Sequence, residues 1–188
     1  IFLTCFSFKV SATEVSKESS SELSVDADIS IEWFEKEKYY LAKGNVLLKK
    51  DGLILKANIV RADYAVENGE NVLKKITAKE KVLLTKDKSE ANGQFMTYDV
   101  AKKIAILSGP FQTFSSPAGY VESKKIIMFD DLKNKAEANG NVKIILSNKS
   151  VIYADNVKAD FTSKDNTEKK AVAKGNVIIE NKVKGRKS

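Results

Sequence analysis

A short phrase recurs along this chain at a nearly regular interval. Its clearest form is Gly44-Asn45-Val46-Leu47-Leu48, which returns over residues 140–144 and 175–179 and, in altered form, over 80–84 and 109–113. The copies begin 36, 29, 31 and 35 residues apart, at Gly44, Glu80, Gly109, Gly140 and Gly175. Internal similarity of this length is typical of repeat proteins, in which each repeat buries an apolar face against its neighbours.

A second phrase follows the first with the same period. It ends on aromatic residues that are 34, 31 and 32 residues apart, at Tyr64, Tyr98, Phe129 and Phe161. In the copies at 57–64 and 154–161 the apolar residues change from one parity to the other. Such a change within one extended segment predicts a bulge or a sharp bend.

Apolar residues in both phrases recur at every second position, which is the period of a β-strand. Val46 and Leu48 therefore share a buried face, while Leu47 faces outward, because a later copy has Lys143 at its position. Asp51-Gly52 predicts a two-residue hairpin and hence antiparallel neighbours. We predict about fourteen to sixteen strands of about five to eight residues each.

The composition excludes several kinds of site. The chain has no histidine and a single cysteine, Cys5, so histidine-based catalysis, zinc fingers and internal disulfides are not expected. We expect no metal and no cofactor. The net charge of +7 comes from scattered lysines and a basic tail, a distribution that argues against nucleic-acid binding.

Acidic residues recur beside the closing aromatics, at Asp63, Asp99, Asp130 and Asp160. They fit two interpretations. They are either turn or cap elements of each repeat, or they supply calcium ligands or the paired carboxylates of an enzyme that cleaves polysaccharide. We favour the structural interpretation, because a residue that recurs once per repeat more commonly serves the fold.

The N-terminal segment has the features of a trimmed secretory signal. Residues 1–8 are largely apolar, and Val10-Ser11-Ala12 has the small-x-small form of a cleavage site. A short buried strand, or a lipid-modified Cys5, are the alternatives. We expect a signal remnant over residues 1–12, a flexible lead-in over 13–24, the repeat domain over 25–181 and a basic tail over 182–188.

Together these motifs resemble a known family. The order Ala-x-Gly-Asn-Val, turn, Ala-Asp and aromatic-Asp, repeated over residues 25–181, is similar to the OstA-like family of lipopolysaccharide-transport proteins, and specifically to its LptA-type periplasmic bridge members. The resemblance implies an all-β fold, an elongated antiparallel β-jellyroll (β-taco) built from four to five repeats. Glu80-Lys81 and Gly109-Pro110 depart from the family pattern, so we expect distortion at these two copies.

The same resemblance implies a function. Acyl chains of lipopolysaccharide would lie in the apolar interior of a periplasmic, non-enzymatic protein, which would self-associate head to tail between inner-membrane LptC-like and outer-membrane LptD-like partners. An LptC-like anchored protein, a secreted β-solenoid enzyme acting on polysaccharide and a structural protein with a dry core are the alternatives. The expected lipid-binding residues are Val46, Leu48, Val60, Tyr64, Val82, Leu84, Met96, Tyr98, Ile127, Phe129, Val142, Ile144, Val157, Phe161 and Val177.

Overall fold

The computed structural model describes residues 23–50, 52–160 and 170–181. In these ranges every regular element is a strand, and the strands form a single 14-stranded sheet. The predicted signal remnant, most of the lead-in and the basic tail lie outside the described residues. The strands are β1 (Ser24–Asp26), β2 (Ser30–Phe34), β3 (Tyr39–Lys50), β4 (Leu53–Glu67), β5 (Glu70–Lys86), β6 (Ser89–Asp99), β7 (Ile104–Ser108), β8 (Gln112–Ser116), β9 (Gly119–Ser123), β10 (Ile126–Asp130), β11 (Lys135–Leu146), β12 (Val151–Asp160), β13 (Lys170–Lys174) and β14 (Ile178–Glu180).

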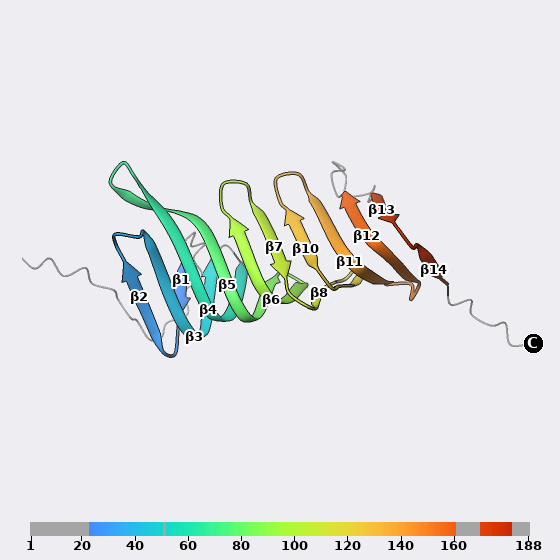
Figure 1. Cartoon of the computed structure of the whole chain (residues 1–188), viewed down its shortest axis with the longest axis horizontal. Helices are drawn as coiled ribbons and strands as arrows, with labels where there is room; N and C mark the ends of the chain where they lie inside the picture. The colour runs from blue at the N-terminus through green and yellow to red at the C-terminus, as the bar shows by residue number, and fades with distance from the viewer. Residues whose placement is uncertain (1–22, 51, 161–169, 182–188) are drawn as a thin grey trace, which may run out of the picture.

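All paired strands are antiparallel, as the hairpin signals predict. Lys50 pairs with Leu53 across the turn that contains Gly52, whose φ is 76°. The strands follow one another along the long axis of the molecule (Figure 1). A β-solenoid, which is a coil of parallel strands, is therefore the wrong architecture for the described residues.

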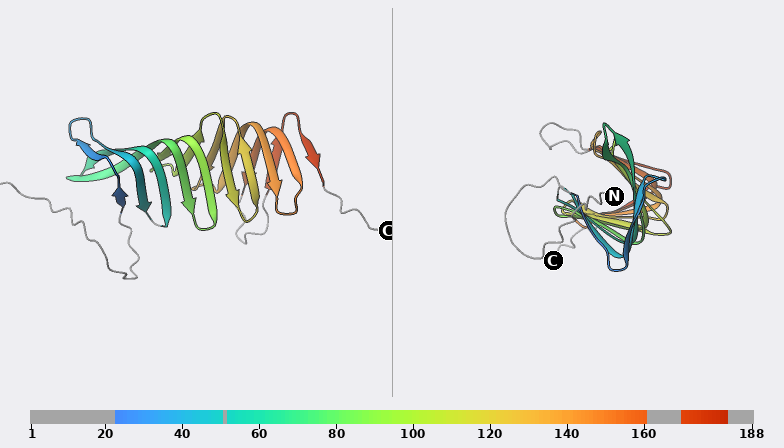
Figure 2. Two further views of the ribbon diagram at one scale, coloured as in Figure 1. Left: turned by 90° about the horizontal axis from the view of Figure 1, so that it is seen from below. Right: turned by 90° about the vertical axis from the view of Figure 1, so that its left-hand side faces the viewer.

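The sheet is folded lengthwise into two arms that meet along a crease. Strands β2, β7, β10 and β13 lie in one arm, called arm A, and β1, β8, β9 and β14 lie in the other, called arm B. The long strands β3, β4, β5, β6, β11 and β12 cross the crease and belong to both arms. Residues 39–43 of β3 pair with β2, for example, whereas residues 47–49 pair with β1. Seen along its length, the sheet has an open, folded-over cross-section (Figure 2).

The repeated Gly-Asn pairs form this crease. Gly44 and Asn45 have φ angles of 84° and 40°, and the same left-handed pair recurs at Gly140-Asn141 and Gly175-Asn176. The pairing of β3 with β4 stops at Lys43 and resumes at Val46. Gly44 and Asn45 of β3 therefore lie opposite the single residue Asn58 of β4, and this bulge bends the strand. Glycine is required here, since a Cβ on Gly44 would lie 2.5 Å from Cγ1 of Ile29.

The two altered copies behave differently from each other. Glu80 and Lys81 adopt the same left-handed pair, with φ angles of 63° and 54°, so the distortion expected there is absent. At Gly109 the distortion is present, because β7 ends at Ser108 and β8 begins only at Gln112. This corner therefore holds one residue more than a Gly-Asn corner.

The strand count agrees with the sequence prediction, but the predicted lengths are wrong for the long strands. β3, β4 and β5 contain 12, 15 and 17 residues. The reason is that the crease bends a strand without ending its ladder. The predicted parity change is confirmed, because the pairing of β4 with β5 shifts register between Lys56 and Ile59.

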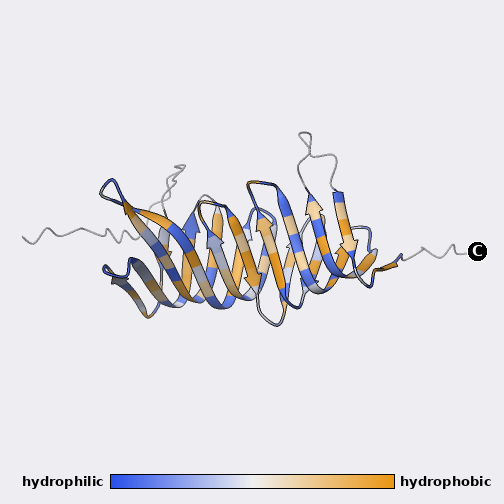
Figure 3. Cartoon of the chain, turned by 45° about the horizontal axis from the view of Figure 1, so that its top comes forward, coloured by the Kyte–Doolittle hydropathy of each residue, from blue (hydrophilic) through white to orange (hydrophobic). Residues whose placement is uncertain are grey.

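The apolar core lies between the arms and falls into two clusters. The larger spans β3 to β7 and includes Leu48, Leu55 and Leu107, whereas the smaller spans β10 to β12 and includes Ile127 and Val142. Hydrophobic and hydrophilic positions alternate along the strands (Figure 3). This alternation places one apolar face of each arm inside the fold.

A candidate ligand groove between the arms

Each arm has several inward rows, and one row in each arm runs through all of its strands. Within the described strands, these two rows consist of uncharged, apolar residues. The arm A row runs through Ala42, Val60, Ala78, Met96, Leu107, Ile127, Ala138, Val157 and Ala173. The arm B row runs through Val25, Leu48, Leu55, Leu84, Ala91, Phe114, Val121, Ile144, Ile152 and Ile179.

Most of the residues expected to bind lipid lie on these inward faces. Leu84, Tyr98, Phe129 and Ile144 are partly buried and pack against the core clusters. Val177 is 46% exposed at the C-terminal end of the sheet, and Phe161 lies outside the described residues. The buried members are Val46, Leu48, Val60, Tyr64, Val82, Met96, Ile127, Val142 and Val157. Lipid binding by these residues stays a prediction.

The two halves of the groove differ in how completely side chains fill it. In the N-terminal half, most residues of the core cluster are buried, and the partly buried rings of Tyr98, Phe114 and Phe129 pack against them. In the C-terminal half, the inward face of arm A includes Ala136, Ala138 and Ala159, and the inward face of arm B includes Ile144 and Ile152. Ala136, Ala159, Ile144 and Ile152 remain partly exposed. The inward surface of the C-terminal half is therefore partly exposed at these four residues.

An aromatic cluster braces the N-terminal end of arm A. Trp33 stacks on Tyr40 with ring centroids 6.2 Å apart, and Tyr40 contacts Tyr64 at 5.2 Å. The indole N–H of Trp33 donates a hydrogen bond of 2.8 Å to the hydroxyl of Tyr64. Trp33 nevertheless keeps 57% of its surface exposed, because no further strand lies beyond β2 in the described fold.

Sequence reasoning missed the inward residues of β8. Aligned with Gly44-Asn45-Val46, the copy at Gly109 would place Phe111 inward, yet Phe111 is exposed. The extra corner residue shifts the parity by one, so Gln112 and Phe114 face the interior instead. The proline at position 110, which the Gly-Asn copies lack, is the sequence feature that could have indicated a different corner here.

Two of the repeated aspartates serve turns, as the structural interpretation predicts. The carboxylate of Asp99 accepts a 3.0 Å hydrogen bond from the backbone N–H of Lys102, and Asp130 accepts an equivalent bond from Lys133. Asp63 instead pairs with Arg61, and Asp160 lies 3.4 Å from the ammonium of Lys135. None of these contacts resembles a pair of catalytic carboxylates.

Tyr98 and Asp130, which lie at the ends of β6 and β10 in arm A, are among the groups with shifted pKa values. Burial, together with the nearby carboxylates of Asp131 and Asp99, raises the pKa of the Tyr98 hydroxyl. Burial would also raise the pKa of Asp130, but the hydrogen bond from the Lys133 backbone and the Lys133 ammonium outweigh it. The pKa of Asp130 therefore lies below its ordinary value.

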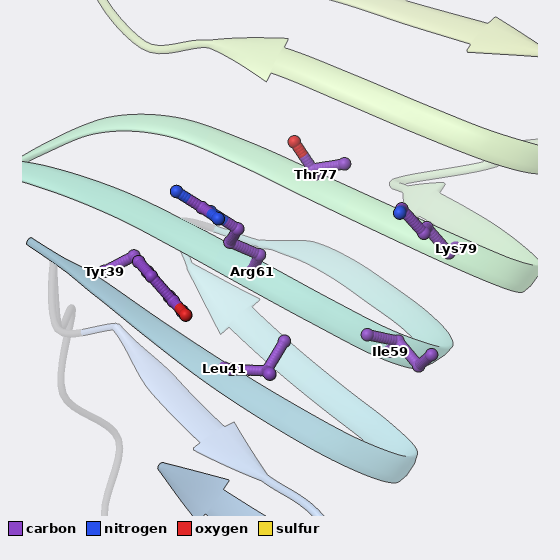
Figure 4. Close-up of a pocket in the computed structure, with 6 residues that line it drawn as sticks. All are labelled: Tyr39, Leu41, Ile59, Arg61, Thr77 and Lys79. Atoms are coloured by element: carbon purple, nitrogen blue, oxygen red, sulfur yellow. The ribbon is translucent and has the colours of Figure 1, made fainter. Parts of the chain in front are cut away.

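A separate hollow of about 250 Å³ lies on the outer face of arm A. Its lining comes from β3, β4 and β5 (Figure 4). The guanidinium of Arg61 covers the ring of Tyr39 at 3.8 Å and pairs with Asp63, so this cation is already engaged. The lining residues are Tyr39, Leu41, Ile59, Arg61, Thr77 and Lys79. The hollow is not part of the interior groove.

Other kinds of site have no support in the part of the chain that the structure describes. Those residues contain no cluster of three or more His, Cys, Asp or Glu side chains placed to hold a metal ion. They also form no helix of the length and hydropathy needed to cross a membrane. The site that the geometry supports best is the interior between the arms, where both core clusters lie.

A single antiparallel sheet, folded along a crease and apolar inside, defines the β-jellyroll class of the LptA type. The family model for the LptA/(LptD N-terminal domain) LPS transport proteins matches residues 24–131, and the chain belongs to this family. The membership confirms the family resemblance found in the sequence. No curated protein sequence gives a significant match.

Among solved structures, the chain is similar to LptH of Pseudomonas aeruginosa, described as the LptA homologous periplasmic component of the conserved lipopolysaccharide transport device. The two share 16% sequence identity and a TM-score of 0.59, over 68% of this chain and 96% of LptH. At this identity the likeness shows the fold, and it confirms the predicted β-jellyroll.

Proposed function

We propose that this chain is a periplasmic, non-enzymatic carrier that holds the acyl chains of lipopolysaccharide between its two arms. Membership of a family of LPS transport proteins supports the substrate class. The observation that carries the proposal is the pair of uncharged inward rows, which run along both arms. Burying an acyl chain contributes about 0.8 kcal/mol per methylene group, so apolar walls suffice for affinity.

The C-terminal half of the groove offers the most space for such chains. In the same register row, Ala136 and Ala159 follow Ile76 and Tyr98 of the N-terminal half, and Ile144 and Ile152 of arm B keep part of their surface exposed. An acyl chain lying there would cover apolar surface that water now contacts. Val142 and Val157, both buried nearby, would form the floor.

We also propose that copies join head to tail and bridge LptC-like and LptD-like partners. Ile31 is 55% exposed at the N-terminal end, and Ile178 and Ile179 are exposed at the C-terminal end. Among the described residues these lie on edge strands, with no further strand paired on their outer side, so their backbone groups could pair with a strand of another copy. Addition of a second sheet at either end would extend both inward rows into one longer groove.

The direct test is the lipid content of the protein. The chain would be purified without detergent from a lipopolysaccharide-producing bacterium, and its extract examined by mass spectrometry. We expect lipopolysaccharide to accompany the wild-type chain and to be depleted from Ile144→Asp, which puts a charge on the inward row. Lys143→Asp, on the outward face of the same strand, is the matched control. Absence of lipid from the folded wild-type chain would refute the proposal.

A further inference from the structure

A polar break interrupts the interior at its midpoint. The inward row of arm B next to the crease contains Gln112 and Ser123 side by side, between Gly93 on one side and Val142 on the other. Both Gln112 and Ser123 are fully buried. Buried polar groups normally have hydrogen-bond partners, so each of these two side chains requires an account.

Ser123 has a structural role. Its hydroxyl lies 3.0 Å from the backbone oxygen of Ile126 and also bonds the backbone oxygen of Asn139. It accepts a further hydrogen bond of 3.3 Å from the backbone N–H of Lys125. These bonds hold the corner between β9 and β10, so the fold itself uses this hydroxyl.

Gln112 has no such role within the described residues. Neither its amide nitrogen Nε2 nor its amide oxygen Oε1 has a hydrogen-bond partner. The side chain is flanked by two glycines: an added Cβ would lie 3.5 Å from its Cγ at Gly93, and 3.3 Å from its Nε2 at Gly109. An unpaired donor and an unpaired acceptor are therefore held together in an apolar interior.

An aromatic pair joins the arms at the same level. Phe114, two residues beyond Gln112 on the same face of β8, meets Phe129 of β10 with ring centroids 5.0 Å apart. Both rings pack against both core clusters, so the pair lies where the two halves of the groove meet. An acyl chain extending through this level would have to pass between the two rings, and it would then run beside the amide of Gln112.

We propose that Gln112, beneath the Phe114–Phe129 pair, is a binding point for a hydroxyl group carried on an acyl chain. A hydroxyl both donates and accepts, and so satisfies Oε1 and Nε2 together, whereas an ester carbonyl satisfies Nε2 alone. This inference rests on the proposed function, because it assigns a specificity to the same groove. Plain hydrocarbon would pass the amide and leave both of its polar atoms unpaired.

The two glutamines of the chain, Gln94 and Gln112, allow a direct observation. In the full chain labelled with ¹⁵N at glutamine side chains, the exposed Gln94 is an internal reference. Addition of 12-hydroxyoctadecanoic acid should shift the side-chain amide signal of Gln112 and leave the signal of Gln94 in place. Octadecanoic acid should change the Gln112 signal less, both in position and in line width. Equal responses of Gln112 to both acids would overturn the proposal.

Affinity provides the second readout. Gln112→Met keeps a long side chain without hydrogen-bonding groups, and Gln94→Met makes the same change at the exposed position. We expect Gln112→Met to reduce the preference for the hydroxylated acid about threefold to tenfold in a competition assay, and Gln94→Met to leave it unchanged.

Removal of the unpaired amide should also raise the melting temperature of lipid-free Gln112→Met by about 2 to 8 °C. Binding of both acids with the same preference in wild type and Gln112→Met would overturn the inference alone. Failure of the wild-type chain to bind either acid would overturn the proposed function together with it.

Discussion

At the scale of single residues, the recurring aspartates illustrate how a repeated polar residue serves the fold. Asp130 is only 6% exposed, yet it is stabilised by the Lys133 backbone N–H at 3.0 Å and the Lys133 ammonium at 3.1 Å. These contacts favour the ionised carboxylate, which lowers its pKa. A lowered pKa in the folded state means that ionisation of Asp130 stabilises the fold.

The lowered pKa of Asp130 predicts how the Asp130→Asn variant should behave. The stabilisation by Asp130 is complete above the unfolded-state pKa of about 4, and is lost as pH falls through the lower folded-state value. Asn keeps a hydrogen-bond acceptor but cannot ionise, so we expect a small fall in melting temperature at pH 7 and a weaker dependence on acid pH. Thermal unfolding between pH 2 and pH 7 tests this, with the exposed Asp131→Asn as control. An unchanged acid profile would contradict it.

The inward residues show what the sequence predicts at this scale and what it does not. Alternation identifies Val46, Val82 and Val142 as buried, because each follows a two-residue crease that fixes its parity. Gln112 and Phe114 escape such reasoning, since the three-residue corner at Gly109 shifts their parity. The absence of partners for Gln112 depends on packing between distant strands, which no local pattern encodes.

At the scale of elements, the crease explains why the repeats exist. Each Gly-Asn pair supplies two consecutive left-handed residues, which turn a strand from arm A into arm B while the ladder continues on both sides. The period of the sequence is thus the distance between successive corners. The sequence predicts the period and the bend, but not that one strand passes through both arms.

Glu80 and Lys81 test this account, because they adopt the left-handed conformation at a steric cost that glycine avoids. We expect Glu80→Gly to raise the free energy of unfolding by about 0.5 to 1 kcal/mol, after allowance for the greater freedom of glycine in the unfolded chain. Lys79→Gly, one residue earlier in the regular ladder, should instead destabilise the fold. Chemical denaturation compares the two, and equal losses would show that the corner does not strain Glu80.

At the scale of the whole molecule, the open ends of the sheet predict self-association. Ile31→Asp at the N-terminal edge or Ile179→Asp at the C-terminal edge should shift head-to-tail oligomers toward monomers, because a charge would be buried in the new contact. Thr97→Asp, on the outer face of arm A, should have no such effect. Sedimentation velocity over a range of concentrations measures this, and a strictly monomeric wild-type chain would refute end-to-end assembly.

The central claim is that lipid occupies the interior rather than the outside of the folded sheet. Photo-crosslinking amino acids would be placed at the inward positions Leu84 and Ile144 and at the outward positions Leu83 and Lys143, which are their neighbours on β5 and β11. The protein would be irradiated with lipopolysaccharide bound. We predict lipid adducts at Leu84 and Ile144, and little or none at Leu83 and Lys143. Equal capture on both faces would contradict the interior groove.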